Sequence, residues 1–464
     1  MNALSLRQIA TFAGGSLTAV DPELMVTKVS TDSRTLRPGD LFIPLRGENF
    51  DGHKFVEQAI ERGASGAMVE ESWRGVTSKT FALIRVADTL AGYQSLAAKY
   101  RKSLPLKVIA ITGSNGKTST KDFLAATLAR RFRVTKTEGN FNNHVGLPQT
   151  MLAANSDDEI GVWEIGMNHP GEIAALAKLA TPDAAIITNI GLAHIEFMGS
   201  REAIAQEKGA LAEAVDATGS VVLNADDPFS ASIAQRTRAN VILAGVENGA
   251  VRATDVRQSA TGCEFTILEG AHRCRAQLPV PGIHMVQNAM LAVAAGRLFG
   301  LSLEECAAGL ASTTLTRARL QIQEINGVQF IDDSYNANPD SMKAALHTLI
   351  ELEADGRRIA VLGQMNELGS ESERGHREVG ETAATLGVDE LIAVGETGAA
   401  IARAAEKAGL KKSLSVNSPE EAAAHLAETV SPGDLILVKG SRSAQMERVL
   451  TAFAQQSSTA GVAP

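Results

Sequence analysis

Between residues 106 and 245 the chain alternates continuous apolar runs with helical patterns, and no other feature of the sequence constrains the fold more strongly. A run that is apolar at every position is buried on both faces, which is typical of strands in a parallel sheet covered by helices. The sequence therefore predicts an α/β fold with a largely parallel central sheet. The five runs are KVIAIT (107–112), EIGVWEIG (159–166), DAAIITNIG (183–191), SVVLNADD (220–227) and NVILAG (240–245).

The chain has 464 residues, which suggests about three domains. Pro105 marks a boundary after a region of short strand signals and turns. Near residues 313–319 the α/β alternation begins again with VQFIDDS, RRIAVLG, DELIAVG and DLILVKG, as in a Rossmann-like domain. We expect a small α/β domain over 1–105, a central domain over 106–314 and a Rossmann-like domain over 315–464. The end, QQSSTAGVAP, is expected to be a disordered tail.

The composition excludes several classes of protein. Hydrophobic residues make up 44% and charged residues 21% of the chain, as in ordinary globular proteins, and the net charge of −9 argues against nucleic-acid binding through a basic surface. The three cysteines form no C-x-x-C pair, so a disulfide framework is not expected. The polar N-terminus is unlike a signal sequence, and no stretch approaches the ~20 apolar residues of a membrane span. We expect a cytoplasmic protein, most simply a monomer.

The stretch VIAITGSNGKTST (108–120) resembles a phosphate-binding loop. A buried strand precedes two glycines, Gly113 and Gly116, and the backbone N–H groups of such a loop form an anion site. Lys117 can reach phosphate oxygens and the Thr118 hydroxyl can bind Mg²⁺. The common P-loop pattern needs glycine where Ile111 stands, so an ordinary strand–turn–helix is the alternative. The strand context with GKT favours a nucleotide site.

Candidate metal ligands follow neighbouring strands. Glu164 ends one strand, at the edge of a parallel sheet where ligands bind, and His194 lies in the loop after the next. Taken alone, the histidine would be a surface group and Lys208 a solvated helix lysine. When Glu164 and His194 are considered together with Thr118, the three residues predict a Mg²⁺ site.

Several motifs occur in the order seen in the Mur ligases, which build the peptide stem of bacterial cell-wall precursors. These are GSNGKTST, TEGNFNNHVGLP, WEIGMNHPGEI, TNIGLAHIEFMGS and EKGAL, followed by PGIHMVQNAMLAVAAG, TRARLQ, DDSYNANPDSM and LVKGSR. The resemblance covers Ser30 to Arg448, and the family's shorter loop, G-x-x-G-K-[ST], accounts for Ile111. Within the family, STDSRTLRPGDLFIPLRGENFDGHKF, GNFNNHVGLP, YNANPDSM and GQMNELG resemble the member that joins D-alanyl-D-alanine to UDP-N-acetylmuramoyl-tripeptide.

The resemblance implies a fold and a chemistry. The first domain would bind the UDP-substrate, the central domain would be a P-loop-type ATPase, and the last would complete the ligase site. ATP would phosphorylate the substrate carboxylate, and an amine would attack the acyl phosphate. Lys117 would hold the β- and γ-phosphates, Thr118 and Glu164 one Mg²⁺, and His194 a second Mg²⁺. Lys208 matches the family lysine that CO₂ carbamylates, which would let it support the second metal.

The resemblance also implies the groups around ATP. Asn288 would bind adenine, Arg319 would reach the γ-phosphate and Asp333 would contact the ribose. The alternatives are that Asn288 caps a turn and that Asp333 caps a helix. The implied catalytic residues are Lys117, Lys208, His194 and Arg319. The implied ATP-binding residues are Gly113, Ser114, Asn115, Gly116, Lys117, Thr118, Ser119, Asn288, Arg319, Asp333, Tyr335 and Asn336.

Recognition of the UDP-substrate is expected from turn arginines in the first domain and from a polar loop beside the phosphate site. Arginine suits a pyrophosphate, although a solvated turn arginine is an equal alternative. The residues are Ser33, Arg34, Arg46, Asn140, Asn142, Asn143 and His144. Lys439 and Arg442 form either a carboxylate site for the stem peptide or D-alanyl-D-alanine, or an exposed charged turn.

Because the phosphate loop and Arg319 belong to different predicted domains, the site would be complete only after closure, with a hinge near residues 314–317. Three alternatives stay open. One is a Mur-family ligase that adds a single amino acid, and another is a P-loop ATPase switch, for which a strand ending in Asp is expected in place of Glu164. A nucleotide-sugar oxidoreductase is disfavoured because the last domain has no convincing G-x-G-x-x-G.

Overall fold

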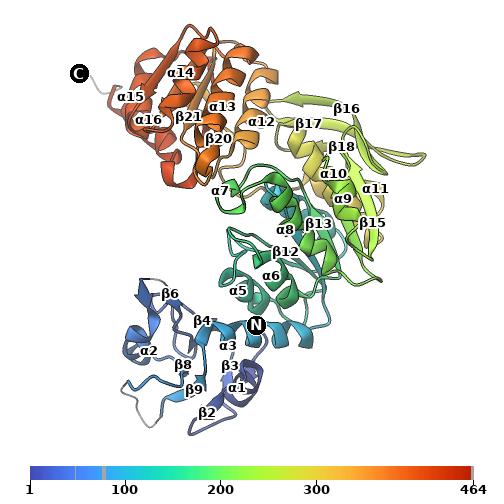
Figure 1. Cartoon of the computed structure of the whole chain (residues 1–464), viewed down its shortest axis with the longest axis vertical. Helices are drawn as coiled ribbons and strands as arrows, with labels where there is room; N and C mark the ends of the chain where they lie inside the picture. Colours follow the sequence, from blue (N-terminus) through green and yellow to red (C-terminus); the bar gives the residue numbers. More distant parts are fainter. Residues whose placement is uncertain (48, 76–79, 461–464) are drawn as a thin grey trace. The chain divides into compact units, whose positions relative to one another are not determined.

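The computed structural model describes residues 1–47, 49–75 and 80–460 (Figure 1). It separates into two compact units. The first unit contains residues 1–110, 132–167 and 172–184; the second contains 111–131, 168–171 and the chain from 185 onward. Strands β10 (Lys107–Thr112) and β13 (Ala184–Ile187) each contain a point where the chain passes from one unit to the other. The three domain ranges expected from the sequence stay predictions, since these units divide the chain differently.

The N-terminal part of the first unit, residues 1–103, is built around a five-stranded sheet in the order β2-β9-β8-β5-β4. Strand β8 is buried at four of its five positions, and its side chains pack with Val56, Ala59 and Phe42 in one core. The elements are β1 (Leu4–Ser5), α1 (Leu6–Ala13), β2 (Ser16–Thr18), β3 (Met25–Val26), β4 (Val29–Ser30), β5 (Leu41–Phe42), β6 (Arg46–Gly47), β7 (Phe50–Asp51), η1 (Gly52–Phe55), α2 (Val56–Glu61), β8 (Gly66–Glu70), β9 (Ala82–Val86) and α3 (Thr89–Ser103).

All five apolar runs of the middle region form strands of one nine-stranded sheet, ordered β11-β12-β10-β13-β14-β15-β16-β17-β18. Strands β11 and β12 pair in parallel, as do β14, β15 and β16. The prediction of an α/β fold is therefore confirmed. The elements are α4 (Lys117–Leu128), β11 (Val134–Lys136), α5 (Gly146–Ala153), β12 (Ile160–Glu164), α6 (Glu172–Ala180), α7 (Ile195–Met198), α8 (Arg201–Glu213), β14 (Ser220–Asn224), α9 (Ser230–Ala234) and β15 (Asn240–Gly245).

An antiparallel extension completes this sheet. It consists of β16 (Val251–Ser259), β17 (Gly262–Glu269) and β18 (His272–Leu278). Their side chains alternate between buried and exposed, as expected for strands with one covered face. Helices α10 (Ile283–Leu298) and α11 (Leu303–Ala311) contact the extension and also pack against α4, the helix that follows the phosphate loop.

The C-terminal segment of the second unit, here residues 318–460, contains a six-stranded sheet in the order β19-β20-β24-β21-β22-β23. All its pairs are parallel except β19 with β20, and in Figure 1 α12 and α13 lie on one side of the sheet and α15 and α16 on the other. The elements are β19 (Gln321–Ile325), β20 (Val328–Asp333), α12 (Pro339–Glu351), β21 (Arg358–Gly363), η2 (Gly369–Glu371), α13 (Ser372–Leu386), β22 (Glu390–Val394), α14 (Ala399–Lys407), β23 (Ser413–Val416), α15 (Pro419–Thr429), β24 (Leu435–Lys439), η3 (Arg442–Ala444) and α16 (Glu447–Ala460).

One expectation about the chain end is wrong. Residues 455–460 belong to helix α16 rather than to a disordered tail, because Val449, Leu450 and Phe453 fix this helix to the sheet core. Residues 461–464 of the expected tail lie outside the described residues. In the described part of the chain, no helix has the length and apolar character needed to cross a membrane.

Candidate ligase site

The loop between β10 and α4 can only be built with glycine at two positions. Gly113 has φ 152° and Gly116 has φ 79°. A Cβ atom at Gly113 would lie 1.8 Å from Thr188 Oγ1, and one at Gly116 would lie 2.3 Å from Asn288 Oδ1. The backbone therefore runs in close contact with its neighbours and leaves its other side to a ligand.

The loop after β13 fixes the shape of the phosphate loop. Asn115 donates its N–H to Asn189 Oδ1 at 2.9 Å, and its carbonyl accepts from Asn189 Nδ2 at 3.0 Å and from the Thr188 hydroxyl. The N–H of Gly191 donates to Ser114 Oγ at 2.8 Å. The loop is thus held rigidly by protein groups, as a preformed anion site requires.

Lys117 begins helix α4 and bends back over the loop. Its Nζ donates to the carbonyl oxygens of Gly113 at 2.7 Å and Ser114 at 3.4 Å. The ammonium group and the N–H groups of a helix N-terminus are both positive, so the sequence-predicted phosphate site has the charge that it needs.

Arg319 brings a second cation to this loop from the C-terminal segment. Its Nη2 lies 3.4 Å from Thr118 Oγ1, and its guanidinium lies 4.1 Å from the centre of the Tyr335 ring. Its Nε is buried without a hydrogen-bond partner among the residues that the structure describes. The structure thus brings Arg319, Tyr335 and Thr118 together, and an anion could accept from the remaining guanidinium N–H groups.

A buried cluster lies where β20 and β24 end. Lys439 Nζ donates to Asp333 Oδ2 at 2.5 Å and to the Asn336 carbonyl at 3.0 Å. Burial lowers the pKa of the neighbouring His284 to about 4, with Asp333 opposing and Lys439 adding to the shift. Lys439 is only 3% exposed, so it does not belong to an exposed charged turn. Arg442, in contrast, is exposed and pairs with Glu447 at 2.9 Å.

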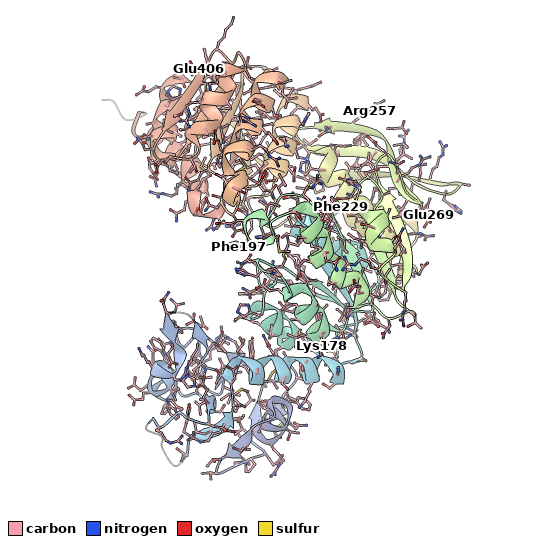
Figure 2. The ribbon with its side chains drawn as sticks, in the orientation of Figure 1. Lys178, Phe197, Phe229, Arg257, Glu269 and Glu406 are labelled. Carbon is pink, nitrogen blue, oxygen red and sulfur yellow. The ribbon has the colours of Figure 1, made fainter. Side chains whose placement is uncertain are left out.

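His194 meets a carboxylate from the C-terminal segment. Its Nδ1 lies 2.6 Å from Glu367 Oε2, and His194 lowers the pKa of the Glu367 carboxyl. Both residues adopt left-handed backbone conformations, with φ 64° and 59°. Beside them, Phe197, which is labelled in Figure 2, packs on the His169 ring with centroids 4.8 Å apart.

Lys208 is buried on helix α8, with 1% of its surface exposed. Burial lowers the pKa of its amine well below the usual value, and the positive charge of Lys117 lowers it further, while Glu207 opposes the shift. Glu207 also accepts the Gly171 N–H at 2.8 Å. The amine is therefore held toward its neutral, nucleophilic form.

In the first unit, Glu164 is buried at the end of β12. Its carboxylate accepts from Asn142 Nδ2 at 2.8 Å, and its N–H donates to Thr137 Oγ1 at 2.9 Å. Asn143 accepts from the N–H groups of Val145 and Gly146 at the start of α5. The His144 carbonyl accepts from Gln94 at 2.9 Å, while Asn140 is exposed. Several groups that the sequence assigned to the UDP-substrate thus also hold the protein together.

The three candidate residues of the N-terminal region each have a protein partner. Ser33 donates to Gln58 Oε1 at 2.7 Å, and exposed Arg34 donates to both carboxylate oxygens of Asp32. Arg46 lies between Asp51 and Glu70, at 3.3 and 3.1 Å. Their roles toward a UDP-substrate stay predictions.

Comparison with known proteins connects this site to a family. The Mur ligase middle domain matches residues 111–296, the Mur ligase glutamate ligase domain 318–442, and the Mur ligase family catalytic domain 25–83. The UDP-N-acetylmuramoyl-tripeptide–D-alanyl-D-alanine ligase of Bacillus subtilis is 41% identical over 96% of this chain and 97% of its own. The chain belongs to the Mur ligase family.

Two solved structures are similar to this Mur ligase over almost its whole length. MurF from Acinetobacter baumannii is 32% identical, with a TM-score of 0.90 and coverage of 98% of this chain and 99% of its own. MurF ligase from Thermotoga maritima in complex with ADP is 29% identical, with a TM-score of 0.82 and coverage of 93% and 98%. The three-domain α/β Mur ligase fold and the ATP-dependent ligase class of the chain follow from these comparisons.

The donor groups of this Mur ligase fit magnesium bound together with a nucleotide. The part of the chain that the structure describes holds no group of three or more His, Cys, Asp or Glu side chains able to bind a metal alone. Mg²⁺ commonly takes one or two protein oxygens and completes its shell with phosphate oxygens and water. In the second unit, the Thr118 hydroxyl at the phosphate loop is a donor of that kind. The role of Glu164, in the first unit, stays a prediction.

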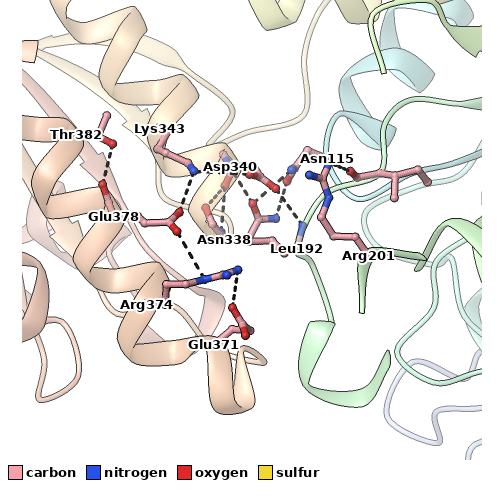
Figure 3. Close-up of polar contacts among 12 residues, drawn as sticks. Asn115, Leu192, Arg201, Asn338, Asp340, Lys343, Glu371, Arg374, Glu378 and Thr382 are labelled. Atoms are coloured by element: carbon pink, nitrogen blue, oxygen red, sulfur yellow. Dashed lines mark hydrogen bonds and ion pairs between the residues drawn. The ribbon is translucent and has the colours of Figure 1, made fainter. Parts of the chain in front are cut away.

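The C-terminal segment is fastened to the phosphate loop through the start of α12 (Figure 3). Asn115 and Asn338 exchange two amide hydrogen bonds, of 2.7 and 3.3 Å. Asp340 Oδ2 accepts the Leu192 N–H at 3.0 Å, and a Cβ at Gly191 would lie 2.4 Å from the same oxygen. Three further ion pairs continue outward from Asp340, through Lys343, Glu378 and Arg374.

Several residues of the site were not found from the sequence. Thr188 and Asn189 stand in the quoted motif TNIG, and Glu367 stands in GQMNELG, but the sequence does not indicate what these side chains bind. The available signal was that polar residues follow apolar strands: Thr188 and Asn189 come directly after β13, and Glu367 lies in the loop after β21. His284, in PGIHMVQN, gave no local signal, because its surroundings come from β20 and β24.

Proposed function

We propose that this Mur ligase joins D-alanyl-D-alanine to UDP-N-acetylmuramoyl-tripeptide with consumption of ATP, giving the UDP-N-acetylmuramoyl-pentapeptide. One observation carries the proposal: a nucleotide-type loop with Arg319 at Thr118 stands in a chain that matches ligases of that name from end to end. Both substrates are small molecules, and the proposal places a monomeric enzyme in the cytoplasm. The ADP of the Thermotoga maritima complex supports ATP as the nucleotide.

The chemistry follows from the weakness of a carboxylate as an electrophile. The carboxylate oxygen of the tripeptide attacks the γ-phosphorus of ATP, ADP leaves, and an acyl phosphate results. The amine of D-alanyl-D-alanine then attacks the acyl carbon, inorganic phosphate leaves, and the nitrogen loses a proton. Lys117 and Arg319 supply positive charge at the phosphoryl group during the first step, where negative charge spreads over its oxygens.

The proposed Mg²⁺ sites use Thr118, Glu164 and His194, with Lys208 supporting the second metal as a carbamate. Magnesium would supply charge neutralisation between the phosphates and the reacting carboxylate. A neutral amine is the form that adds to CO₂, so the lowered pKa of Lys208 favours carbamate formation. The attack forms a C–N bond and releases one proton, which leaves an anionic carbamate.

Nucleotide and substrate contacts complete the proposal. Asn288, Tyr335 and Asn336 would line the adenine site and Asp333 would contact the ribose. Asn288 lies so close to Gly116 that a Cβ there would be 2.3 Å from Oδ1, which gives that asparagine a part in shaping the loop as well. The UDP-substrate would be held by Ser33, Arg34, Arg46 and the loop of Asn140, Asn142, Asn143 and His144. Lys439 and Arg442 remain candidates for a substrate carboxylate.

One assay separates this function from its alternatives. Phosphate release is measured with ATP, Mg²⁺ and UDP-N-acetylmuramoyl-tripeptide, with and without D-alanyl-D-alanine, and the product is identified by mass. We expect release only with both substrates, and none from a Lys117→Ala variant. Turnover with single amino acids in place of the dipeptide would favour a sibling ligase. Release without any peptide substrate would favour an ATPase switch.

A further inference from the structure

The loop that joins β21 to η2 is braced from within the C-terminal segment. Met365 donates its N–H to His376 Nε2 at 3.0 Å, and Asn366 Nδ2 donates to Ser443 Oγ at 2.6 Å. His376 is itself buried and its Nδ1 lies 2.7 Å from the Ser372 carbonyl. Glu367, the next residue, is therefore presented from a fixed backbone rather than from a loose surface loop.

Glu367 meets the loop that carries His194 in two ways. Its carboxylate lies 2.6 Å from His194 Nδ1, and its carbonyl accepts the Glu196 N–H at 3.2 Å. Gly369 packs so closely on Glu196 that a Cβ there would lie 3.1 Å from Glu196 Cγ. The contact thus includes backbone as well as side chains, which an incidental surface ion pair would not need.

The backbone at both ends of this contact is strained. His194 and Glu367 each have a positive φ, a conformation that residues with a side chain rarely adopt. Such conformations persist where surrounding structure imposes them, and they concentrate at functional sites. Asp340 holds Leu192, two residues before His194, so the C-terminal segment fixes the histidine loop on both sides.

We propose that Glu367 is a positioning residue for His194. His194 Nδ1 faces the Glu367 carboxylate at 2.6 Å as an ion-pair contact, although the pair does not reach hydrogen-bond geometry. This contact leaves Nε2 as the ring nitrogen for a metal. A histidine that binds a metal through one nitrogen usually gives its other N–H to a carboxylate or carbonyl, which fixes the tautomer and ring orientation. Because Glu367 comes from the C-terminal segment, His194 takes its binding orientation only when that segment is docked. Only one part of this inference rests on the proposed function, namely that His194 binds a metal.

The first test measures the histidine ring without metal, nucleotide or substrate. The ring nitrogens of ¹⁵N-histidine-labelled protein are recorded at about pH 8, where an ordinary imidazole is neutral, and His194 is assigned from a His194→Asn variant. We expect a single Nδ1–H tautomer in the parent protein and a mixture in Glu367→Ala. Glu371→Gln is the matched control, since Glu371 lies four residues further along and pairs with Arg374. An unchanged His194 tautomer in Glu367→Ala would overturn the proposal.

The second test measures metal affinity without turnover. Binding of Mn²⁺ in the presence of ADP is followed by electron paramagnetic resonance. We expect Glu367→Ala to weaken the affected Mn²⁺ site by about 10- to 100-fold, Glu367→Asp to restore part of the loss, and Glu371→Gln to match the parent. Equal Mn²⁺ affinity in all four proteins would mean that the pair only docks the C-terminal segment. Neither test uses a peptide substrate, so failure of the proposed ligase activity would be seen separately.

Discussion

At the scale of single residues, the glycines of the phosphate loop are set by contact and not only by backbone conformation. Gly116 and Gly270 both have positive φ, but a Cβ at Gly270 would meet nothing within 4 Å, whereas one at Gly116 would collide with Asn288. A substitution at Gly270 would therefore meet conformational strain alone, whereas one at Gly116 would meet both strain and a steric clash. The nucleotide site depends on the second effect.

We predict that Gly116→Ala lowers the free energy of unfolding by about 2–5 kcal/mol, because overpacking adds to the left-handed penalty. Gly270→Ala should lose only about 1–2 kcal/mol. Denaturant unfolding measures both values, and ATP binding should weaken in Gly116→Ala alone. Adding Asn288→Ala should recover part of the stability of Gly116→Ala. Equal losses in the two alanine variants would show that the contact with Asn288 is not limiting.

At the scale of elements, helix α12 begins at a residue with two tasks. Asn338 caps the helix by accepting the Ser341 N–H at 3.0 Å, and the same side chain exchanges amide hydrogen bonds with Asn115 in the phosphate loop. The start of a helix in the C-terminal segment is thus tied directly to the nucleotide loop.

We predict that Asn338→Ala costs about 2–3 kcal/mol of stability, since it removes both the cap and the amide pair. Asn338→Asp keeps a capping oxygen and should cost about 1 kcal/mol. A double-mutant cycle of Asn115→Ala with Asn338→Ala should show a coupling of about 1 kcal/mol. The cycle of Asn115→Ala with Ser341→Ala is the control and should show none. Zero coupling in the first cycle would contradict the role of the pair.

Elements with both faces buried were predictable from the sequence, and those with polar faces were not. The runs that form β10, β12 and β13 are apolar and buried except at their ends, which is typical of a covered strand. Strands β19 and β23 were not predicted, because QIQEI and SLSV bury few side chains and take their conformation from their neighbours in the sheet. The helix at residues 455–460 was missed because its own sequence is polar.

At the scale of the whole molecule, the linker to the C-terminal segment is held at one end. Thr316 donates both its N–H and its hydroxyl to Asp122 Oδ2 on α4, at 2.9 and 2.8 Å. The next residues include Ala318 and Leu320, both with positive φ. The expected hinge at 314–317 thus contains a residue that is tied to α4, and the strained stretch follows it. A hinge at 314–317 stays a prediction.

We predict that ATP together with UDP-substrate compacts the enzyme in solution, because bound phosphates would stabilise the docked arrangement in which Arg319 lies at Thr118 and Glu367 at His194. X-ray scattering with and without the ligands measures the change in radius of gyration. The Lys117→Ala variant, which should bind the phosphates poorly, is the control and should show little change. Curves of the parent enzyme that superimpose would exclude closure.

The candidate site was predictable only where its chemistry is contiguous in sequence. Gly113 to Thr118 carry their own pattern, and the structure builds them as a preformed loop. The pairing of Asn115 with Asn338 joins residues 223 positions apart, and that of His194 with Glu367 likewise joins distant segments. No local pattern specifies such contacts, because they arise from packing of one segment on another.

The amide pair of Asn115 and Asn338 also has a consequence for how this sequence can evolve. Each amide satisfies the other, so a change at one position leaves a partly buried polar group without its partner. Selection should then favour a second change that restores the pairing, and the two positions should vary together among relatives. A substitution at only one of the two positions would be tolerated only in relatives that hold the C-terminal segment to the phosphate loop by another contact.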